Sequence, residues 1–201
     1  MKTVFIGVDE VGRGPIAGPV AVGAFVVLDP AAVSRSRIFR GVKESKQLTP
    51  EARERWFAII QSAQRSGLVD FAVTFQSEKI IDTKGISFAI STALASSLEK
   101  LGVEPARAVV LLDGGLRAPD HFKNQKTIIR GDTKETVIAL ASICAKVLRD
   151  RRMVRLALKH PGYGLAEHKG YGTKAHYAAI KRQGLSVLHR QSFCRSLAKN
   201  Q

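Results

Sequence analysis

The feature that most constrains this chain is the alternation of short apolar runs with longer segments of helical periodicity. The apolar runs are rich in β-branched residues, as buried strands are, and cover residues 3–8, 20–28, 71–75, 108–112 and 127–129. The helical segments cover residues 49–67, 86–101, 134–158 and 173–183. Strands that alternate with helices predict an α/β domain.

The length and the hydropathy pattern bound the organisation of the chain. Its 201 residues are enough for one domain, with residues 160–201 as a helical C-terminal subregion. No apolar run reaches the roughly 18 residues of a membrane span, and residues 1–7 lack the pattern of a signal peptide. We therefore expect a single domain over residues 1–201, a monomer, a cytoplasmic location and no membrane contact.

The charge balance favours a polyanionic partner. Lys and Arg number 32 against 17 Asp and Glu, which gives a formal net charge of +15. Such a field attracts nucleic acid, and contacts to phosphates would make binding depend on salt. On charge alone, a generally basic protein and a protein bound to acidic membrane stay open as alternatives.

The two cysteines give no sign of a zinc site. Neither Cys144 nor Cys194 belongs to a Cys-x-x-Cys pair or to a Cys/His cluster. Cys144 falls in the apolar stripe of the long helix, where a small core residue fits. This usage is typical of a reducing, cytosolic compartment.

Acidic residues follow three of the apolar runs. Asp9, Asp113 and Asp132 come directly after a predicted strand or within three residues of one. Strands that share a sheet bring their ends together, so these carboxylates are expected to converge at one edge. A divalent cation would relieve their repulsion, and hard oxygen ligands favour Mg²⁺ or Mn²⁺ over zinc. Glu10 adds a fourth acid, because we expect the first strand to end at this point and strict alternation need not hold.

The same acids have a purely structural interpretation. Acids after strands are common turn residues and helix N-caps, and Asp132, just before Thr133 and a helix, could be only a cap. Charge and periodicity therefore indicate no more than a possible divalent-metal site for phosphoryl transfer on an α/β domain.

A glycine–arginine turn (Gly12, Arg13 and Gly14) directly follows the acidic pair. Its amides can approach an anion closely and its arginine can pair with a phosphate, although most such turns are only turns. Lys146 and Arg149 lie off the apolar stripe of the long helix and could contact phosphates, although solvated surface is the simpler interpretation of each.

Residues 162–173 interleave tyrosines with basic residues and glycines. That mixture suits stacking on a sugar or base beside a phosphate, with Tyr171 as the candidate ring. An ordinary loop whose tyrosines pack on the core is an equally good interpretation.

Taken in order, these segments resemble the type 2 ribonuclease H family, and ribonuclease HII in particular. The motifs that carry the resemblance span almost the whole chain and comprise residues 7–15 with 18–20, Lys46 with Leu48, residues 112–114, Gly131 with Asp132, residues 141–150, residues 168–173, and Arg190 with Ser192 and Phe193.

The resemblance implies a ribonuclease H-like fold, in which helices flank a mixed central β-sheet, with a helical C-terminal part. It implies cleavage of the RNA strand of RNA–DNA hybrids and cutting 5′ of ribonucleotides embedded in duplex DNA. Two divalent ions, Mg²⁺ or Mn²⁺, would perform the hydrolysis and leave 5′-phosphate and 3′-hydroxyl ends. The implied catalytic and metal-site residues are Asp9, Glu10, Asp113 and Asp132.

The resemblance also implies a set of substrate-binding residues, which are Gly12, Arg13, Gly14, Lys46, Ser142, Lys146 and Tyr171. The glycine–arginine turn would read the 2′-hydroxyl of a ribonucleotide and hold the flanking phosphates. Tyr171 would stack on the sugar at an RNA–DNA junction, and the other three would contact phosphates or backbone.

The sequence departs from the family pattern at two positions. Glu44 replaces the usual aspartate before Ser45 and Lys46, and because we place it outside the metal site, it bears on the loop rather than on catalysis. Val11 replaces the more frequent alanine and also occurs in the sister type, ribonuclease HIII, which usually carries an extra N-terminal domain. The chain begins at its first strand, so we expect no such domain, and we recognise no clamp-binding peptide in residues 196–201.

Two other functions stay open. One is a metal nuclease that prefers continuous hybrids to junctions, as in ribonuclease HIII. The other is a nucleic-acid-binding protein without catalysis, whose acids are structural. A chelator separates the second from a nuclease, because binding alone should survive it. No protein partner can be identified from the sequence.

Overall fold

The computed structural model describes residues 3–195. Five strands form the sheet, and they are β1 (Val4–Val11), β2 (Val20–Val27), β3 (Val69–Gln76), β4 (Ala108–Asp113) and β5 (Gln125–Ile128). The α-helices in this range are α1 (Pro30–Ser36), α2 (Pro50–Arg65), α3 (Glu78–Lys84), α4 (Ile86–Lys100), α5 (Gly131–Lys134), α6 (Thr136–Lys159), α7 (Leu165–His168) and α8 (Lys174–Gln183). Short 3₁₀ turns cover η1 (Ser45–Gln47), η2 (Pro105–Arg107) and η3 (Gln191–Phe193).

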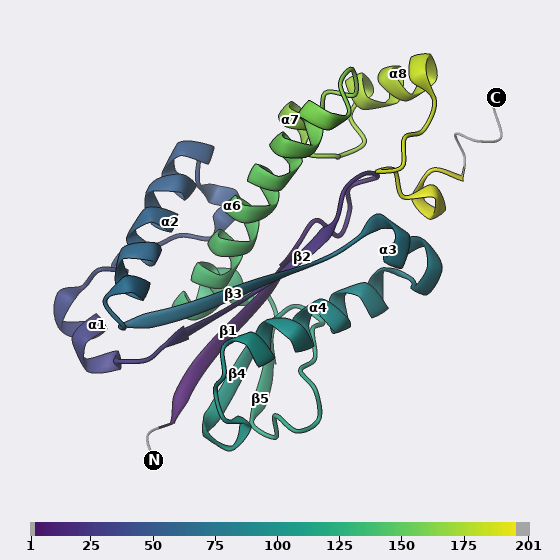
Figure 1. The fold of residues 1–201 in the computed structure, drawn as a ribbon. Coiled ribbons are helices and arrows are strands. Elements are labelled where there is room, and N and C mark those ends of the chain that lie inside the picture. Colours follow the sequence, from purple (N-terminus) through teal and green to yellow (C-terminus); the bar gives the residue numbers. More distant parts are fainter. Residues whose placement is uncertain (1–2, 196–201) are drawn as a thin grey trace.

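The central sheet is mixed, with the strand order β3-β2-β1-β4-β5. Strand β2 runs antiparallel to both of its neighbours, β1 and β3, whereas β4 runs parallel to both β1 and β5. Helix α4 covers one face of the sheet, and α2 and α6 cover the other (Figure 1). The structure therefore confirms the predicted α/β fold with a mixed sheet between helices.

Alternating side chains of the strands fill an apolar core on each face of the sheet. On one face, Ile6 packs in a cluster with Leu94 of α4. On the other face, Phe25 packs with Ile60 of α2 and Leu140 of α6. Both cores exclude water from the strands that carry the acidic residues.

Helix α6 lies unusually close to the middle of the sheet. A Cβ at Gly7 in β1 would stand 2.2 Å from the backbone carbon of Val137, so only glycine permits this approach. The close contact places α6 directly against the strand that carries Asp9.

A third apolar cluster holds the C-terminal helices against the rest of the chain. Ile16 and Met153 pack there with Leu165 of α7, Ile180 of α8 and Leu188. The predicted helical C-terminal part is thus confirmed up to residue 195. The expectation that residues 196–201 carry no clamp-binding peptide lies outside the described residues. No helix within residues 3–195 is both long enough and apolar enough to cross a membrane.

Some predictions of local structure were wrong. The first strand does not end at Asp9 and Glu10, because β2 continues to pair with β1 opposite both residues. Residues 35–47, predicted as a loop, contain the end of α1 and the turn η1. Helix α1 has no buried residue, so it leaves no apolar stripe in the sequence. Helix α3 was not predicted at all.

Candidate active site

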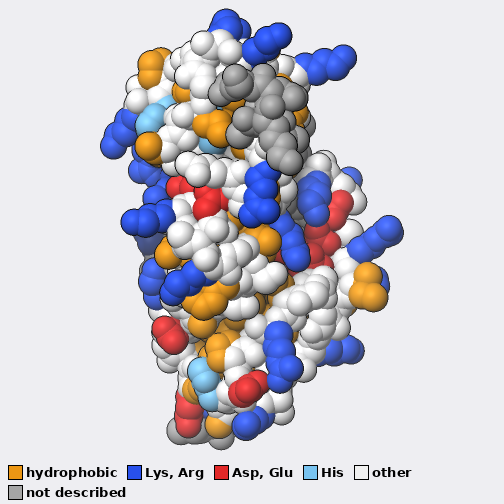
Figure 2. All heavy atoms as spheres, turned by 90° about the vertical axis from the view of Figure 1, so that its right-hand side faces the viewer, with side chains coloured by type: hydrophobic (Ala, Val, Ile, Leu, Met, Phe, Trp, Pro, Cys, Tyr) orange, Lys and Arg blue, Asp and Glu red, His pale blue; other side chains and the backbone are white. Residues whose placement is uncertain are grey.

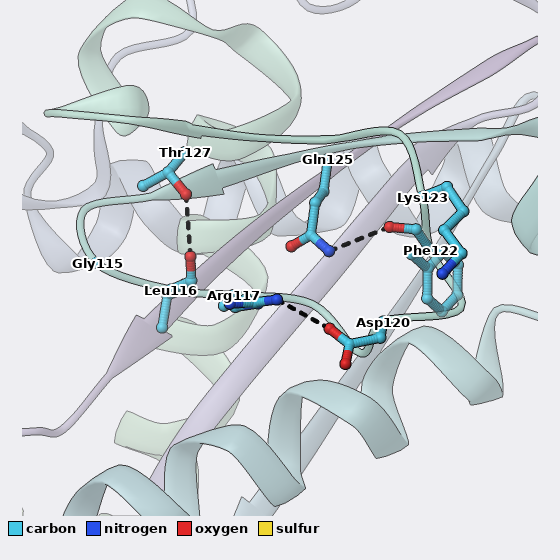
Figure 3. Close-up of a pocket in the computed structure, with 8 residues that line it drawn as sticks. All are labelled: Gly115, Leu116, Arg117, Asp120, Phe122, Lys123, Gln125 and Thr127. Atoms are coloured by element: carbon cyan, nitrogen blue, oxygen red, sulfur yellow. Dashed lines mark hydrogen bonds and ion pairs between the residues drawn. The ribbon is translucent and has the colours of Figure 1, made fainter.

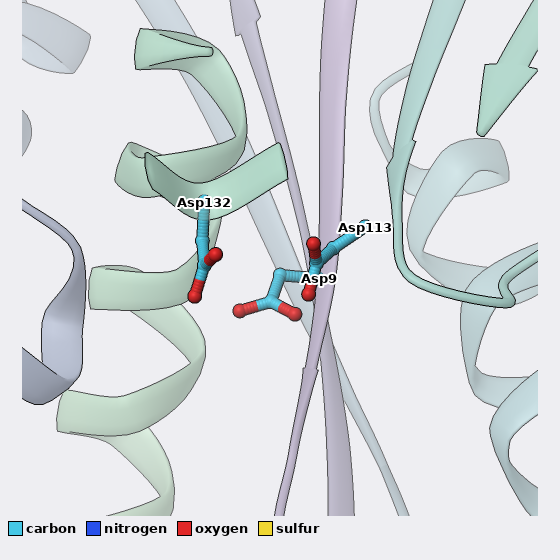
Figure 4. Close-up of side chains that lie close together, drawn as sticks. All are labelled: Asp9, Asp113 and Asp132. Carbon is cyan, nitrogen blue, oxygen red and sulfur yellow. The ribbon is translucent and has the colours of Figure 1, made fainter. Parts of the chain in front are cut away.

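Three aspartates from three separate elements meet beside the sheet (Figure 4). Asp9 lies in β1, Asp113 ends β4 and Asp132 lies in α5. One carboxylate oxygen of each lies within 4.8 Å of the others. The first two meet because β1 and β4 are parallel neighbours in which Val8 stands opposite Leu112, one residue before each acid.

A backbone contact brings in the third aspartate. The amide of Gly131 donates a 2.6 Å hydrogen bond to Oδ1 of Asp113, which fixes the start of α5 against the end of β4. Asp132 follows directly and is buried. Arg130 occupies the N-cap position of α5, and Asp132 lies inside the helix, so its interpretation as a simple cap was wrong.

Burial disfavours the charged forms of these carboxyls. Desolvation raises the pKa of Asp9 to about 8; a hydrogen bond with Ser142 opposes the shift, and the neighbouring acids add to it. Desolvation also raises the pKa of Asp132, and Glu44 adds to that shift. Ionising these carboxyls together therefore costs free energy in the metal-free protein, and a bound cation would offset that cost.

The three aspartates fit a divalent metal ion. All the donors are carboxylate oxygens, the hard ligands that Mg²⁺ and Mn²⁺ prefer. A cation at this point would also favour the ionised form of Asp9. The residues that could hold it come from elements fixed by the sheet and by the contact between Asp113 and Gly131.

Glu10 does not join this group of atoms. Since β1 continues past it, the strand alternation holds, and Glu10 is the less buried of the acidic pair. Its amide donates to Oδ1 of Asp9 at 2.8 Å, while its Oε1 lies 3.5 Å from Nη1 of Arg13. Burial raises the pKa of Glu10, and Arg13 opposes that shift. Of the four acids expected at the metal site, the structure brings three together.

The loop before α2 reaches the three aspartates. Nζ of Lys46 lies 3.7 Å from Oδ2 of Asp132, although the lysine side chain is 79% exposed. Partial burial acts to lower the pKa of Lys46, but the surrounding acids, led by Asp132, raise it overall. Oγ of Ser45 shares a 2.8 Å hydrogen bond with Oγ of Ser142. Glu44 lies close enough to Asp132 to raise the pKa of that carboxyl, so the loop that carries Glu44 reaches the candidate site.

The other candidates on α6 lie below the surface. Ser142 is buried and hydrogen-bonds Asp9, so it can orient that carboxylate. Lys146 is partly buried and donates a 2.8 Å hydrogen bond to Asp150. Burial lowers the pKa of Lys146, an effect that Asp150 opposes. Arg149 is 0% exposed, so its interpretation as solvated surface was wrong.

The glycine–arginine turn and the tyrosine segment are joined through the backbone. The carbonyl of Gly170 accepts hydrogen bonds from the amides of Ile16, at 2.9 Å, and Ala17, at 3.2 Å. Next to this junction, Tyr171 is 44% exposed, whereas Tyr163 is buried. The interpretation as a loop whose tyrosines pack on the core therefore holds for Tyr163, whereas the ring of Tyr171 is accessible to a ligand.

Sequence reasoning gave no role to Arg190, which is fully buried. It donates hydrogen bonds to the carbonyls of Gly12 and Arg13, at 2.7 and 3.0 Å. Its only sequence signal was its place in the C-terminal motif, because its partners lie more than 170 residues away.

Basic side chains extend along the height of the face shown in Figure 2. A separate hollow of about 740 Å³ lies under the loop that follows β4 (Figure 3). In its lining, Arg117 pairs with Asp120 at 3.0 Å. The lining residues include none of the candidate site residues, so the aspartates and this hollow are distinct features.

Solved structures with the same fold define the class of protein. The chain resembles the ribonuclease H2 of Pyrococcus horikoshii OT3 with a TM-score of 0.72 and 25% identity, over 98% of both chains. It also resembles the chain in the PCNA:RNase HII complex from Archaeoglobus fulgidus, with a TM-score of 0.71 and 21% identity over 93% of both chains. The fold and its three clustered aspartates define a ribonuclease H-like enzyme with a site suited to divalent metal.

Sequence comparison narrows the class to one family. Residues 6–196 match the profile of the family described as Ribonuclease HII. The ribonuclease HII of Caldicellulosiruptor bescii is 42% identical over 95% of this chain and 86% of that protein. That of Prochlorococcus marinus subsp. pastoris is 41% identical over 96% of this chain and 88% of that protein. The chain belongs to the ribonuclease HII family, whose members are endoribonucleases that hydrolyse RNA in RNA–DNA hybrids.

Proposed function

We propose that this chain cuts the RNA strand of RNA–DNA hybrids and also cuts 5′ of single ribonucleotides embedded in duplex DNA. The observation that carries the proposal is the convergence of Asp9, Asp113 and Asp132 within 4.8 Å. The glycine–arginine turn begins three residues after Asp9, and its Arg13 and Gly14 are exposed. A strand bound there would present its phosphate to the acids and its ribose to the turn.

The proposed metal site takes two divalent ions, Mg²⁺ or Mn²⁺, held by Asp9, Glu10, Asp113 and Asp132. When bound, these ions supply an activated water and stabilise the leaving 3′-oxygen, which leaves 5′-phosphate and 3′-hydroxyl ends. The chain's own part is to fix the carboxylates. Ser142 holds one through its hydroxyl, and the amide of Gly131 holds another.

Specificity in this proposal comes from the ribose rather than from the bases. The amides of the glycine–arginine turn contact the 2′-hydroxyl and the flanking phosphates, and Tyr171 packs on the sugar at the junction. Lys46, Ser142 and Lys146 are the further phosphate or backbone contacts in this proposal, and Lys46 is the most exposed of the three. We therefore expect little sequence preference. Residues 1–201 act as one catalytic domain, as a monomer in the cytoplasm, and the proposal involves no protein partner.

A labelled DNA duplex with one internal ribonucleotide tests the proposal. With Mg²⁺ or Mn²⁺, the wild type should cut 5′ of the ribonucleotide, and mapping of the ends should give a 3′-hydroxyl and a 5′-phosphate. Cleavage of a continuous hybrid alone would favour the ribonuclease HIII-like alternative, and no cleavage of either substrate would leave a binding protein.

The variants Tyr171→Ala and Tyr171→Phe test the source of the junction preference. Tyr171→Ala should slow cleavage of the single-ribonucleotide duplex far more than cleavage of a continuous hybrid. Tyr171→Phe keeps the ring and should stay close to wild type. Equal cutting of the single-ribonucleotide duplex by Tyr171→Ala and wild type would contradict the proposed role of this ring.

A further inference from the structure

Two fully buried arginines lie behind the glycine–arginine turn. Arg149 of α6 and Arg190 are each 0% exposed. Within residues 3–195, neither guanidinium has a carboxylate oxygen within 4.0 Å. A buried cation is costly unless its N–H groups are hydrogen-bonded. In this structure the partners are backbone carbonyls, most of them in the turn and its continuation, and among the described residues only Nη2 of Arg149 is buried without a partner.

Arg190 binds the turn from the inside. Its Nη2 donates to the carbonyl of Gly12 at 2.7 Å, and its Nη1 donates to the carbonyl of Arg13 at 3.0 Å. Its Nε and Nη2 both donate to the carbonyl of Gly18, at 2.9 and 2.8 Å. One guanidinium therefore closes the loop between residues 12 and 18 with four hydrogen bonds.

These bonds fix the direction of two amides. A trans peptide holds its N–H opposite its C=O. Since the carbonyl of Gly12 points at Arg190, the amide of Arg13 points away from it, and the carbonyl of Arg13 turns the amide of Gly14 outward in the same way. Apart from Gly14 itself and its two chain neighbours, no described residue has a heavy atom within 4 Å of the place that a Cβ at Gly14 would occupy. Successive amides that face open space are an arrangement that binds anions.

Arg149 supports the turn from a second side. It donates to the carbonyl of Pro19 at 2.9 Å and to that of Lys169 at 3.1 Å. Gly12 rests directly on it, because a Cβ there would stand 2.1 Å from Nε of Arg149. The bond to Lys169 also ties the turn to the segment that carries Tyr171. The two arginines thus fix the turn and the tyrosine segment relative to each other.

We propose that Arg190, supported by Arg149, is a positioning residue for the substrate strand. It turns the amides of Arg13 and Gly14 toward the ribose–phosphate backbone, and its buried positive charge adds to the attraction of the phosphate. This inference rests on the proposed contact between the glycine–arginine turn and RNA. It gives the segment after α8 a part in substrate binding, although that segment lies 177 residues from Arg13 in the sequence.

The test measures binding rather than cleavage. A fluorescent RNA–DNA hybrid is titrated with wild type, Arg190→Ala and Arg190→Lys in the presence of a chelator, and binding is read by anisotropy. Arg190→Ala should weaken binding about tenfold or more, because it removes charge-assisted hydrogen bonds that orient both amides. Millimolar guanidinium should restore part of that loss. Arg190→Lys keeps the positive charge but lacks the planar set of guanidinium N–H donors, so it should weaken binding about threefold or more.

Ile180→Ala is the matched control. Ile180 of α8 is buried in the same apolar cluster as Ile16, and it lies outside both the glycine–arginine turn and the tyrosine segment. It should lower Tm to a similar degree as Arg190→Ala and leave hybrid binding unchanged.

Three results decide the inference. It is overturned if folded Arg190→Ala binds within about twofold of wild type, or if Ile180→Ala loses as much binding. If Arg190→Ala does not fold, Arg190→Lys decides, and affinity within about twofold of wild type overturns the inference. A wild type that neither binds nor cuts hybrids would instead contradict the proposed function.

Discussion

Asp113 accepts a 2.6 Å hydrogen bond from the amide of Gly131, and this contact joins the end of β4 to the start of α5. One carboxylate thus belongs to the candidate metal site and also holds the helix that carries Asp132. Since a hydrogen-bond acceptor and a metal ligand need different chemistry, substitution can separate the two roles.

Asp113→Asn and Asp113→Ala should therefore behave differently. Asparagine keeps an Oδ1 acceptor for Gly131 and relieves the repulsion between acids, so its Tm in a chelator should be no lower than that of wild type. Alanine leaves the amide unpaired and should reduce the free energy of unfolding by about 1–3 kcal/mol. Calorimetric titration should show that both variants lose affinity for Mn²⁺. Wild-type affinity in Asp113→Asn would mean that Asp113 is not a ligand.

Metal binding should release a proton from Asp9. Because desolvation raises the pKa of this carboxyl to about 8, it is mostly protonated at about pH 7 in the metal-free protein. Metal affinity should rise up to about tenfold per pH unit until about pH 8 and then level off. Calorimetry in two buffers of different ionisation enthalpy counts the released protons. In Asp9→Asn no proton should be released from position 9. A wild-type metal affinity that does not change with pH in this range would refute the prediction.

His176 should make the protein less stable in acid. It is buried, with Nδ1 2.9 Å from the carbonyl oxygen of Tyr171 and Nε2 3.1 Å from Nε2 of His189. Burial lowers its pKa from 6.5 to about 4, so the unfolded chain takes up the proton first as the pH falls. The stability that this group contributes is complete above about pH 6.5 and should fall by roughly 3 kcal/mol toward pH 4. Urea denaturation across this range measures the slope, which His176→Asn should flatten; an unchanged slope would count against the prediction.

Lys46→Gln should weaken substrate binding more than the chemical step. The lysine is exposed but lies 3.7 Å from Asp132, where a phosphate would also lie. We expect KM for a hybrid to rise about threefold to tenfold, and the slope of log KM against log salt to fall by about one. Lys126→Gln, an exposed lysine in β5, makes the same charge change away from the aspartates. Equal effects of the two variants would mean that Lys46 contributes only to the overall positive charge and makes no specific phosphate contact.

The sequence predicted those elements whose burial leaves a periodic pattern. The apolar run that ends at Asp113 became β4, and Thr49 caps α2 as expected. Helix α1 buries no side chain and so leaves no pattern. The continuation of β1 past Asp9 depends on its pairing with β2, which no local pattern in β1 reveals.

The buried arginines that support the glycine–arginine turn could not be predicted from the sequence, because their contacts are not local. Arg149 and Arg190 look like surface cations, because arginine usually is one. Arg149 donates to the carbonyl of Pro19, which lies 130 residues away in the sequence, and Arg190 donates to that of Gly12, which lies 178 residues away. Only the packed structure brings these groups together.

Asp9, Asp113 and Asp132 are the core of the metal-dependent catalytic site that we propose. The most direct test follows cleavage of a labelled RNA–DNA hybrid by wild type and Asp113→Asn with Mg²⁺, and then with a chelator, while hybrid binding is measured in parallel. We expect cleavage by wild type only with metal, and a rate for Asp113→Asn lower by about two orders of magnitude or more with hybrid binding retained. Undiminished cleavage by Asp113→Asn, or cleavage by wild type in the chelator, would contradict this proposal.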